Sequence, residues 1–581
     1  MRQNLKSGWL LLGHGTILAF LAIAILSSNR LCRGGEKAHE PSSAPPRLYG
    51  FMADAPRTPE SVQYYRRLID FCADWGMNAL IFRITDDQGV AIRLESHPEL
   101  LTHKNALTPA EVRELVQYAQ HRGIDLIPEV ESFGHSKYIT SVKQYADLAD
   151  RNPKDTEHFN GLIPTHPRVL HLMEDIYREV AALFPSRFLH GGCDEVAWGG
   201  SEFTLRALQT RTRSEIWAQH INSLDELARK TGKEFIIWGD HPLRVDPQIL
   251  GLLNKDIIIM DWDYSSTDPS AVEKTARKVL GSGLRVIGGP ALIYCKWGPR
   301  PGSEQLRNID AFADAYLRID DPRCLGVIVT NWIPSRYIQG SIWDGIAYAA
   351  VSIRQGSSVA RETAFQRFVE RHYGSVWNET WADIFRSYYD ITPSRKRCAP
   401  DSTLPKLPVP WHNDQELVSV MEGGAISIPP FMRVLSQLDL CEPLVRKNFQ
   451  DLKSFRLSLE YLGEIFWRNS VLAQEASNPK ADKESAAVLI RAIADRDRRL
   501  LDALEADWDQ GRPSDSPIKS QIAYQPEDRL VSRFAEAASF SNELANNPDR
   551  FSALLSKAKT QIRSDQQASV TPAGGCSKDG E

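Results

Sequence analysis

Eight short apolar segments alternate with segments of helical pattern between residues 48 and 332, and this alternation restricts the fold more than any other feature. The apolar segments, rich in β-branched residues as strands are, cover residues 48–52, 78–84, 124–130, 187–193, 234–238, 256–262, 284–289 and 324–332. Helical patterns cover residues 60–75, 109–122, 167–184, 202–231, 270–280 and 304–317. Apolar strands that alternate with helices indicate a parallel sheet covered on both faces.

Eight strand–helix units in about 310 residues are typical of a (β/α)8 TIM barrel, so the sequence predicts an α/β barrel over residues 47–357. A doubly wound sheet is the alternative, disfavoured because no glycine-rich phosphate loop follows the first apolar segment. Residues 358–560 carry amphipathic helical patterns and predict an α-helical C-terminal domain. Residues 561–581 are polar and predict a disordered tail.

The N-terminus predicts export. A basic flank and an apolar stretch from Trp9 to Leu26 make residues 1–33 resemble a signal peptide. The stretch is also about as long as the shortest transmembrane helix, so an uncleaved anchor that attaches the protein to a membrane is the alternative. Residues 34–46 are rich in proline, serine and glycine and indicate a linker. Either reading places the rest of the chain in the periplasm, outside the cell or on a membrane.

Composition excludes several classes of protein. A hydrophobic content of 42% and a charged content of 25% are typical of a folded soluble chain. The net charge of −5 arises from interspersed acids and bases, which argues against nucleic-acid binding. The eight cysteines have no metal-ligand spacing. Glu129, Glu131, His135, His190 and Asp194 could in principle bind a metal, but their spacing matches no metal motif. We therefore expect no metal and no cofactor.

The segment FLHGGCDEV, residues 188–196, ends one predicted strand in an adjacent pair of acids, Asp194 and Glu195. Strand alternation would place His190, Gly192 and Asp194 on one face, with Glu195 where the strand becomes a loop. Neighbouring carboxylates repel each other, which raises one pKa and keeps a proton available near neutral pH. Taken alone, such a pair is more often a solvated acidic turn than a catalytic site.

Polar and aromatic residues also follow the other predicted strands, at the end of a barrel where active sites are built. They are Asp54, Arg57, Asp86, Asp87, Glu129, Glu131, His135, Trp238, Asp240, Asp261, Trp262, Asp263, Tyr294, Asn331 and Trp332. This clustering favours a catalytic role for the acidic pair over a solvated turn.

Four motifs in order resemble glycoside hydrolase family 20, the β-N-acetylhexosaminidases, especially divergent members that lack an accessory N-terminal domain. FLHGGCDEV resembles the family signature His-x-Gly-Gly-Asp-Glu, with Cys193 at the second glycine. Asp54-Ala-Pro-Arg57 resembles its Asp-x-x-Arg element. Residues 86–89 resemble the segment after the second strand, and residues 127–135 resemble a Pro-Glu-apolar-acid-x-x-Gly-His segment. The resemblance covers roughly residues 49–356.

The resemblance implies an exo-acting β-N-acetylhexosaminidase that cleaves terminal 2-acetamido-2-deoxy-β-hexosides of a glycan with retained configuration. The substrate's acetamido oxygen attacks the anomeric carbon, so the protein supplies no nucleophile. It implies that Glu195 is the general acid and then the base, and that Asp194 accepts the acetamido N–H. The implied substrate-binding and supporting residues are Arg57 for sugar hydroxyls, Tyr294 for the acetamido oxygen, His135 and His190 for orienting the acids, and Trp238, Trp262 and Trp332 for the pocket wall.

One departure leaves the substrate open. The family's Trp-Gly-Glu after the eighth strand is Trp332-Ile333-Pro334 here, so the acid that reads the distal sugar hydroxyls is missing. Gluco and galacto configurations therefore remain alternatives. So do two other functions, an inactive barrel that binds amino-sugar polymers and a hydrolase of a different or sulfated 2-acetamido sugar.

Overall fold

The computed structural model describes residues 47–151, 161–294, 299–391, 411–423, 429–512 and 530–570. The predicted signal peptide or anchor and the linker, residues 1–46, lie outside these ranges. Within them, no helix combines the length and the apolar character needed to cross a membrane.

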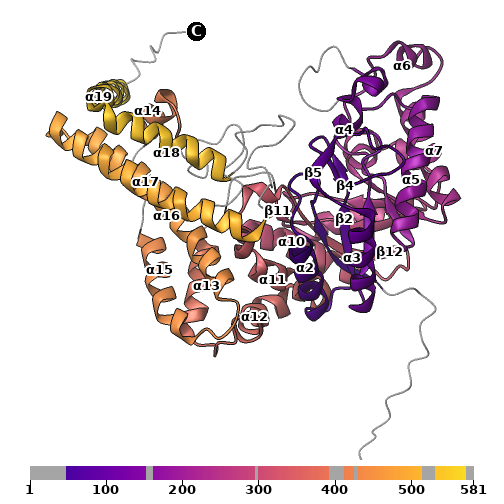
Figure 1. Ribbon diagram of the computed structural model, residues 1–581, viewed down its shortest axis with the longest axis horizontal. Coiled ribbons are helices and arrows are strands. Elements are labelled where there is room, and N and C mark those ends of the chain that lie inside the picture. The colour runs from indigo at the N-terminus through magenta and orange to yellow at the C-terminus, as the bar shows by residue number, and fades with distance from the viewer. Residues whose placement is uncertain are drawn as a thin grey trace, which may run out of the picture. The chain divides into compact units, whose positions relative to one another are not determined.

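All eight predicted strands form one parallel sheet that closes on itself (Figure 1). They are β1 (Leu48–Ala53), β2 (Ala79–Arg83), β6 (Asp125–Glu129), β7 (Phe188–His190), β8 (Glu234–Trp238), β9 (Ile258–Asp261), β10 (Arg285–Gly288) and β12 (Cys324–Asn331). Neighbours in this order pair with each other, and β1 also pairs with β12. Because a doubly wound sheet leaves its edge strands unpaired, this closure excludes that alternative and confirms the (β/α)8 barrel.

Helices follow the strands as predicted, with one exception. They are α2 (Val62–Asp74), α3 (Pro109–His121), α5 (Pro167–Leu183), α7 (Arg213–Lys230), α9 (Pro269–Gly281) and α10 (Ser303–Arg318). A further helix, α11 (Trp343–Gln355), follows β12 and was not predicted. The single helix predicted over residues 202–231 is wrong, since α6 (Glu202–Ala207) and α7 are separate. Thr212 caps α7 by exchanging hydrogen bonds with Glu215, and this cap starts a new helix.

Strand alternation separates the core into two layers. Inside the barrel, one apolar cluster includes Ile81, Ile127 and Ile236. Outside it, Leu80 and Leu126 belong to a larger cluster between the strands and the helices. Successive side chains of a strand point to opposite faces, so the last inward side chain of each strand reaches the carboxyl end of the barrel.

Two strand arrangements were not predicted. β3 (Thr85–Asp86), β4 (Gly89–Ile92) and β5 (Thr102–Leu107) form a small three-stranded sheet directly after β2. A short strand, β11 (Ala291–Ile293), pairs with the end of β12. The first arrangement holds Asp86 and the following Asp87 over the mouth of the barrel, where both are buried.

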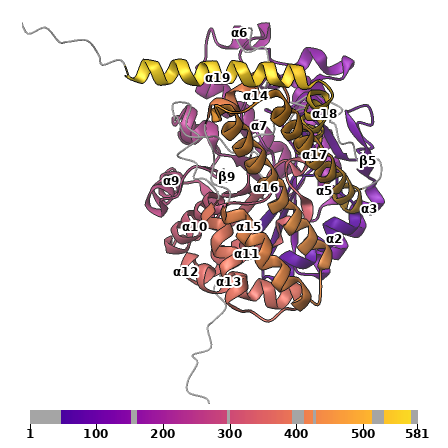
Figure 2. The same ribbon diagram turned by 90° about the vertical axis from the view of Figure 1, so that its left-hand side faces the viewer.

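The predicted helical C-terminal region is also present (Figure 2). It comprises α12 (Ser357–Phe368), α13 (Glu379–Ile391), α14 (Asp414–Glu422), α15 (Pro429–Cys441), α16 (Phe449–Ser477), α17 (Lys483–Gly511), α18 (Leu530–Asn546) and α19 (Pro548–Val570). α19 continues to Val570, so the prediction of disorder from residue 561 is wrong for its first part. Polarity suggested that tail, but its glutamines and alanines are adequate helix formers.

Candidate active site

The segment FLHGGCDEV leaves the strand earlier than its sequence suggests. β7 ends at His190, and Gly192, Cys193 and Glu195 take positive φ angles of 64°, 75° and 47°. Alternation therefore does not govern Asp194, which corrects the predicted shared face. The turn itself directs Asp194 inward, with its side chain 9% exposed, and leaves the Glu195 side chain 44% exposed.

A third carboxylate, that of Glu131, lies directly beneath this turn. Glu131 Oε2 accepts a hydrogen bond from the Cys193 backbone N–H at 3.1 Å. A Cβ atom on Gly192 would lie only 1.9 Å from the same oxygen. Only glycine fits at that point, because the backbone approaches the carboxylate too closely for any side chain.

His135 connects the acids of the turn with those above β2. Its Nδ1 lies 3.3 Å from Asp87 Oδ2, and its Nε2 lies 3.3 Å from Glu195 Oε2 and 3.7 Å from Asp194 Oδ2. Burial disfavours an imidazolium, but Asp194, Asp87 and Glu195 outweigh burial and raise the pKa of His135 well above its usual value. The ring is therefore a cation held among carboxylates at neutral pH.

The two adjacent acids have opposite pKa shifts. Burial, together with Asp240 and Glu195, raises the pKa of Asp194 to about 7, although His135 opposes the shift. Burial also acts on Glu195, but its hydrogen bond to His135 and the charges of His135 and Arg57 lower its pKa. One carboxyl group thus retains a proton near neutral pH, as expected, and in this structure that group is Asp194.

A buried arginine that the sequence reasoning missed holds the base of the site together. Arg83, at the end of β2, is fully buried and pairs with four carboxylates. Its partners are Asp54 at 2.7 Å, Glu131 at 2.7 Å, Glu129 at 2.9 Å and Asp86 at 3.1 Å. Alternation from Ile81 places Arg83 inside the barrel, and that pattern is the signal that could have identified it.

Arg57 lies above this cluster. Its Nη2 is 3.0 Å from Asp86 Oδ2 and its Nη1 is 3.5 Å from Asp54 Oδ2. Its guanidinium carbon lies 5.1 Å from the centre of the Trp332 ring. The structure thus brings together two predicted residues, an arginine with planar donors and an indole face.

Aromatic rings form a connected group that includes Trp332. The Tyr264 ring lies 5.0 Å from Trp262 and 4.8 Å from Tyr294, and its hydroxyl accepts a hydrogen bond from Trp332 Nε1 at 2.9 Å. Burial and the nearby acids raise the pKa of Tyr264 well above its usual value, so its hydroxyl keeps a proton to donate. The sequence does not indicate Tyr264, because it lies beyond the residues that directly follow β9 (Ile258–Asp261).

Trp238 and His190 lie beneath the site instead of at its surface. Both are completely buried, with ring centres 4.5 Å apart. Trp238 Nε1 donates to Glu129 Oε1 at 3.1 Å. Burial and the charge of Arg83 lower the pKa of His190, so this ring is neutral.

A residue that follows β8, Asp240, also forms a hydrogen bond with the turn. The Glu195 backbone N–H donates to Asp240 Oδ2 at 2.9 Å, and His241 Nδ1 lies 3.3 Å from the same oxygen. The sequence places Asp240 at a strand end without indicating a role. Through the backbone bond it fixes Glu195 at the edge of the site.

Three side chains have the geometry of a cation site. His135, Asp194 and Glu195 each offer one ligand atom, and these atoms lie within 4.8 Å of one another. Metal ligation requires a neutral imidazole. The surrounding carboxylates favour the protonated ring of His135, so a proton and a metal ion would compete at this position.

Comparison with known proteins identifies the barrel domain. The family model described as "Glycosyl hydrolase family 20, catalytic domain" matches residues 48–314. A β-hexosaminidase of Vibrio furnissii is 29% identical over 245 residues, which are 37% of this chain and 39% of that protein. A lacto-N-biosidase of Bifidobacterium bifidum is 27% identical over 325 residues, 52% of this chain and 27% of the relative. The chain thus spans well under half the length of these relatives.

Among solved structures, a family 20 exo-β-N-acetylglucosaminidase from Vibrio harveyi in complex with N-acetylglucosamine is similar at 22% identity. The match covers 55% of this chain and 54% of that one, with a TM-score of 0.40. The assignment rests instead on the matched domain, the closed barrel and the ordered motifs. Residues 48–314 of this chain are therefore a catalytic domain of glycosyl hydrolase family 20.

Proposed function

We propose that this protein is a glycoside hydrolase that removes terminal 2-acetamido-2-deoxy-β-hexosides with retained anomeric configuration. The observation that carries the proposal is the contact of His135 with both Asp194 and Glu195. The burial of Asp194 and the hydrogen bond between His135 and Glu195 together give the adjacent carboxyl groups different proton affinities, as an acid and a hydrogen-bond acceptor require. The β-hexosaminidase relatives support the same substrate class.

Substrate binding would move the proton to the residue that needs it. An acetamido N–H that donates to Asp194 favours its ionised form. A sugar that covers the half-exposed Glu195 carboxyl removes it from water and favours its neutral form. Both effects transfer the shared proton from Asp194 to Glu195, beside the leaving oxygen.

The reaction then needs no protein nucleophile. The acetamido oxygen bonds to the anomeric carbon while the glycosidic bond breaks, and Glu195 gives its proton to the departing oxygen. Asp194 stabilises the positive charge that develops on the acetamido group. Glu195, now a carboxylate, takes a proton from the water that attacks the anomeric carbon, and the oxazolinium ring opens.

The surrounding side chains suit a pyranose ring. Trp332 offers an indole face, and Arg57 offers planar donors beside it. Tyr294, the residue predicted from the sequence, and its neighbour Tyr264 are the candidates for donating to the acetamido oxygen. Trp262 extends the aromatic wall.

The test is hydrolysis of 4-nitrophenyl N-acetyl-β-glucosaminide and its galacto isomer, with the product anomer followed by NMR. We expect retention. Glu195→Gln should lower kcat by about 10²–10⁴-fold, and less for a dinitrophenyl leaving group that needs no proton. Glu202→Gln, an exposed acid at the start of α6, is the control. Unchanged turnover in Glu195→Gln, or an inverted product, would contradict the proposal.

A second candidate is a hydrolase of a different 2-acetamido sugar, favoured by Pro334 standing where the family has an acid. One protein similar to this chain is named a lacto-N-biosidase and others are named β-hexosaminidases, so the names of the relatives do not point to a single substrate. A panel of disaccharide and sulfated glycosides separates the two candidates. Sugar binding without any turnover would indicate the inactive barrel. We also propose that the protein is exported, and fractionation of cells tests this.

A further inference from the structure

The loop after β12 is tied to the sugar-facing side of the site by its backbone. Ile333 adopts a positive φ of 55°, and its N–H donates to Asp54 Oδ2 at 2.8 Å. Asp54 in turn pairs with Arg83 and Arg57. The position of this loop is therefore coupled to Arg57 through one shared carboxylate, and to Trp332 by direct chain connection.

The left-handed conformation of Ile333 must be held by its surroundings. For a residue with a Cβ atom it costs about 1–2 kcal/mol, and a β-branched side chain is especially unfavourable there. Such a conformation persists only where neighbouring groups enforce it. The hydrogen bond from Ile333 to Asp54 is one such contact. A second contact, at Pro334, comes from another part of the chain.

This second contact comes from the helical C-terminal region. Arg512 directly follows α17, and its Nη2 donates to the Pro334 carbonyl oxygen at 3.0 Å. The same nitrogen lies 3.2 Å from Glu60 Oε1, with both side chains at most 3% exposed. The Trp508 ring, one turn earlier, stacks on the guanidinium at 3.8 Å. A single buried arginine thus contacts the loop after β12 and the loop after β1.

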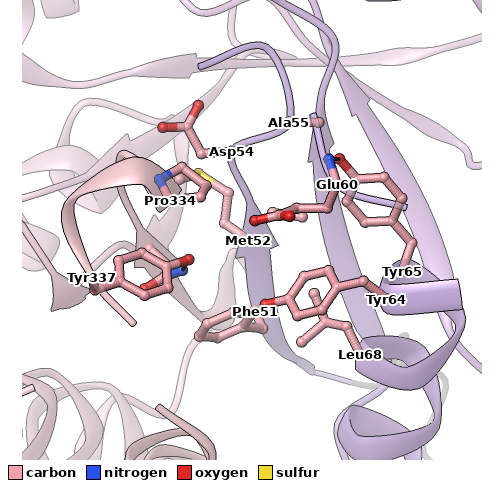
Figure 3. Close-up of a pocket in the computed structure, with 12 residues that line it drawn as sticks. Phe51, Met52, Asp54, Ala55, Glu60, Tyr64, Tyr65, Leu68, Pro334 and Tyr337 are labelled. Atoms are coloured by element: carbon pink, nitrogen blue, oxygen red, sulfur yellow. Dashed lines mark hydrogen bonds between the residues drawn. The ribbon is translucent and has the colours of Figure 1, made fainter. Parts of the chain in front are cut away.

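Glu60 stands across a small cavity from the loop that Arg512 holds. Figure 3 shows its carboxyl group between Pro334 and Tyr337 on one side and Tyr64 and Tyr65 on the other. Burial raises the pKa of Glu60, and Arg512 opposes that shift. The distance between Arg512 Nη2 and Glu60 Oε1 makes them a buried ion pair, in which removing one partner has a large effect.

Helices of the C-terminal region also contact the loop after β12 at other points. α16 and α17 contact residues Gln339–Ser341, and α18 contacts residues Pro334–Arg336. A Cβ atom on Gly340 would lie 2.5 Å from Ser454 Oγ of α16. The segment is thus enclosed between the barrel mouth and three helices of the C-terminal region.

We propose that Arg512 is a positioning residue that fixes the loop after β12, and through it Trp332 and Arg57, for sugar binding. This inference rests on the proposed function. It makes the helical region part of the substrate site rather than a separate module. The loop is held through its backbone, at Pro334 by Arg512 and at Ile333 by Asp54. It therefore needs no acidic side chain at position 334 to keep its position.

The experiment compares Arg512→Met and Arg512→Lys in the full chain, with Arg498→Met as the control on the exposed side of α17. Arg512→Met should raise KM about tenfold with kcat changed less than threefold, because the loop and not the acids is displaced. Arg512→Lys keeps the charge beside Glu60 but loses the planar fork, so we expect a rise of about threefold. Arg498→Met should match wild type.

Binding of N-acetylglucosamine by calorimetry gives a readout that needs no turnover. We expect the Kd to rise in parallel with KM in both Arg512 variants. If wild type binds the sugar without hydrolysing any glycoside while Arg512→Met binds it more weakly, the proposed function fails and the positioning role stands. If wild type hydrolyses the glycoside and both KM and Kd are unchanged in the variants, the positioning role is overturned.

Arg512→Lys also provides a test if Arg512→Met fails to fold. If Arg512→Met does not give a cooperative thermal transition, Arg512→Lys decides the question by itself. A folded Arg512→Lys enzyme with unchanged KM and Kd overturns the proposal. Glu60→Gln removes the charge and keeps the Pro334 bond, so it should lower Tm while leaving KM near the wild-type value.

Discussion

The charge on His135 should set the upper pH limit of activity. Its imidazolium lowers the pKa of Asp194, which the structure nevertheless places at about 7. The acid pair can donate a proton only while it holds one. Activity of the wild type should therefore fall as pH rises through about 7, and a variant without the imidazolium should retain activity to higher pH.

His135→Asn is the appropriate substitution. The His135 backbone has a φ of 43°, a left-handed conformation that asparagine tolerates better than most residues. His135 Nε2 lies 3.7 Å from Asp194 Oδ2. At about 4 Å and an effective dielectric constant of about 20, two unit charges interact by about 4 kcal/mol. Since one pKa unit is about 1.4 kcal/mol, the upper bound on the shift is about three units.

The observed shift should be smaller than that bound. Arg83 and Arg57 remain in the variant and continue to stabilise carboxylates, and water can enter the space that the ring leaves. We therefore expect the high-pH limb of the kcat/KM profile to move up by about one to two units. The apparent pKa belongs to the acid pair, because Asp194 and Glu195 share one proton.

The assay is kcat/KM for an aryl N-acetylglucosaminide between pH 4 and about 10. His121→Asn, an exposed histidine in the last turn of α3, controls for loss of a titrating ring. The maximal rate of His135→Asn should also fall, since Glu195 loses a hydrogen-bond partner. A high-pH limb that stays in place or moves to lower pH would refute the reasoning.

Three further predictions follow from the packing of the site. Gly192→Ala should abolish activity and destabilise the protein by more than about 2 kcal/mol in urea unfolding. The new methyl group would lie 1.9 Å from a buried Glu131 oxygen, and the φ of 64° at this position is unfavourable for alanine. Arg83→Met should lower the free energy of unfolding by about 3–5 kcal/mol, whereas Arg122→Met in an exposed ion pair should change it by less than about 1 kcal/mol; equal effects would contradict the argument. Tyr264→Phe removes the acceptor of Trp332 Nε1 and should raise KM about tenfold, and an unchanged KM would remove Tyr264 from the site.

The strands and most helices of the barrel could be predicted because their signals are local. Every predicted strand appears in the closed sheet, since a buried parallel strand must be apolar on both faces. The Thr212 cap that divides one predicted helix was also readable, since its partner Glu215 follows at capping-box spacing. The sheet formed by β3, β4 and β5 was not, because strands of two to six residues carry too little pattern.

The site could be located but not assembled from the sequence. Strand ends identified Asp194, Glu195, Arg57 and His135, because a barrel gathers those ends on one face. The sequence also indicated that one acid of the pair retains a proton. It could not assign that proton to Asp194, because the shift depends on burial and on a histidine far away along the chain.

The sequence by itself determined the barrel and the family, and it indicated the two acids, since each of these depends on residue type at short spacing. Only the tertiary structure decided which acid holds the proton and which arginines hold the site together. Arg83 lies within a strand, and Arg512 follows a helix far along the chain, yet both contact groups at the barrel mouth. Their effect depends on distances between charges that only folding creates, and no local pattern encodes those distances.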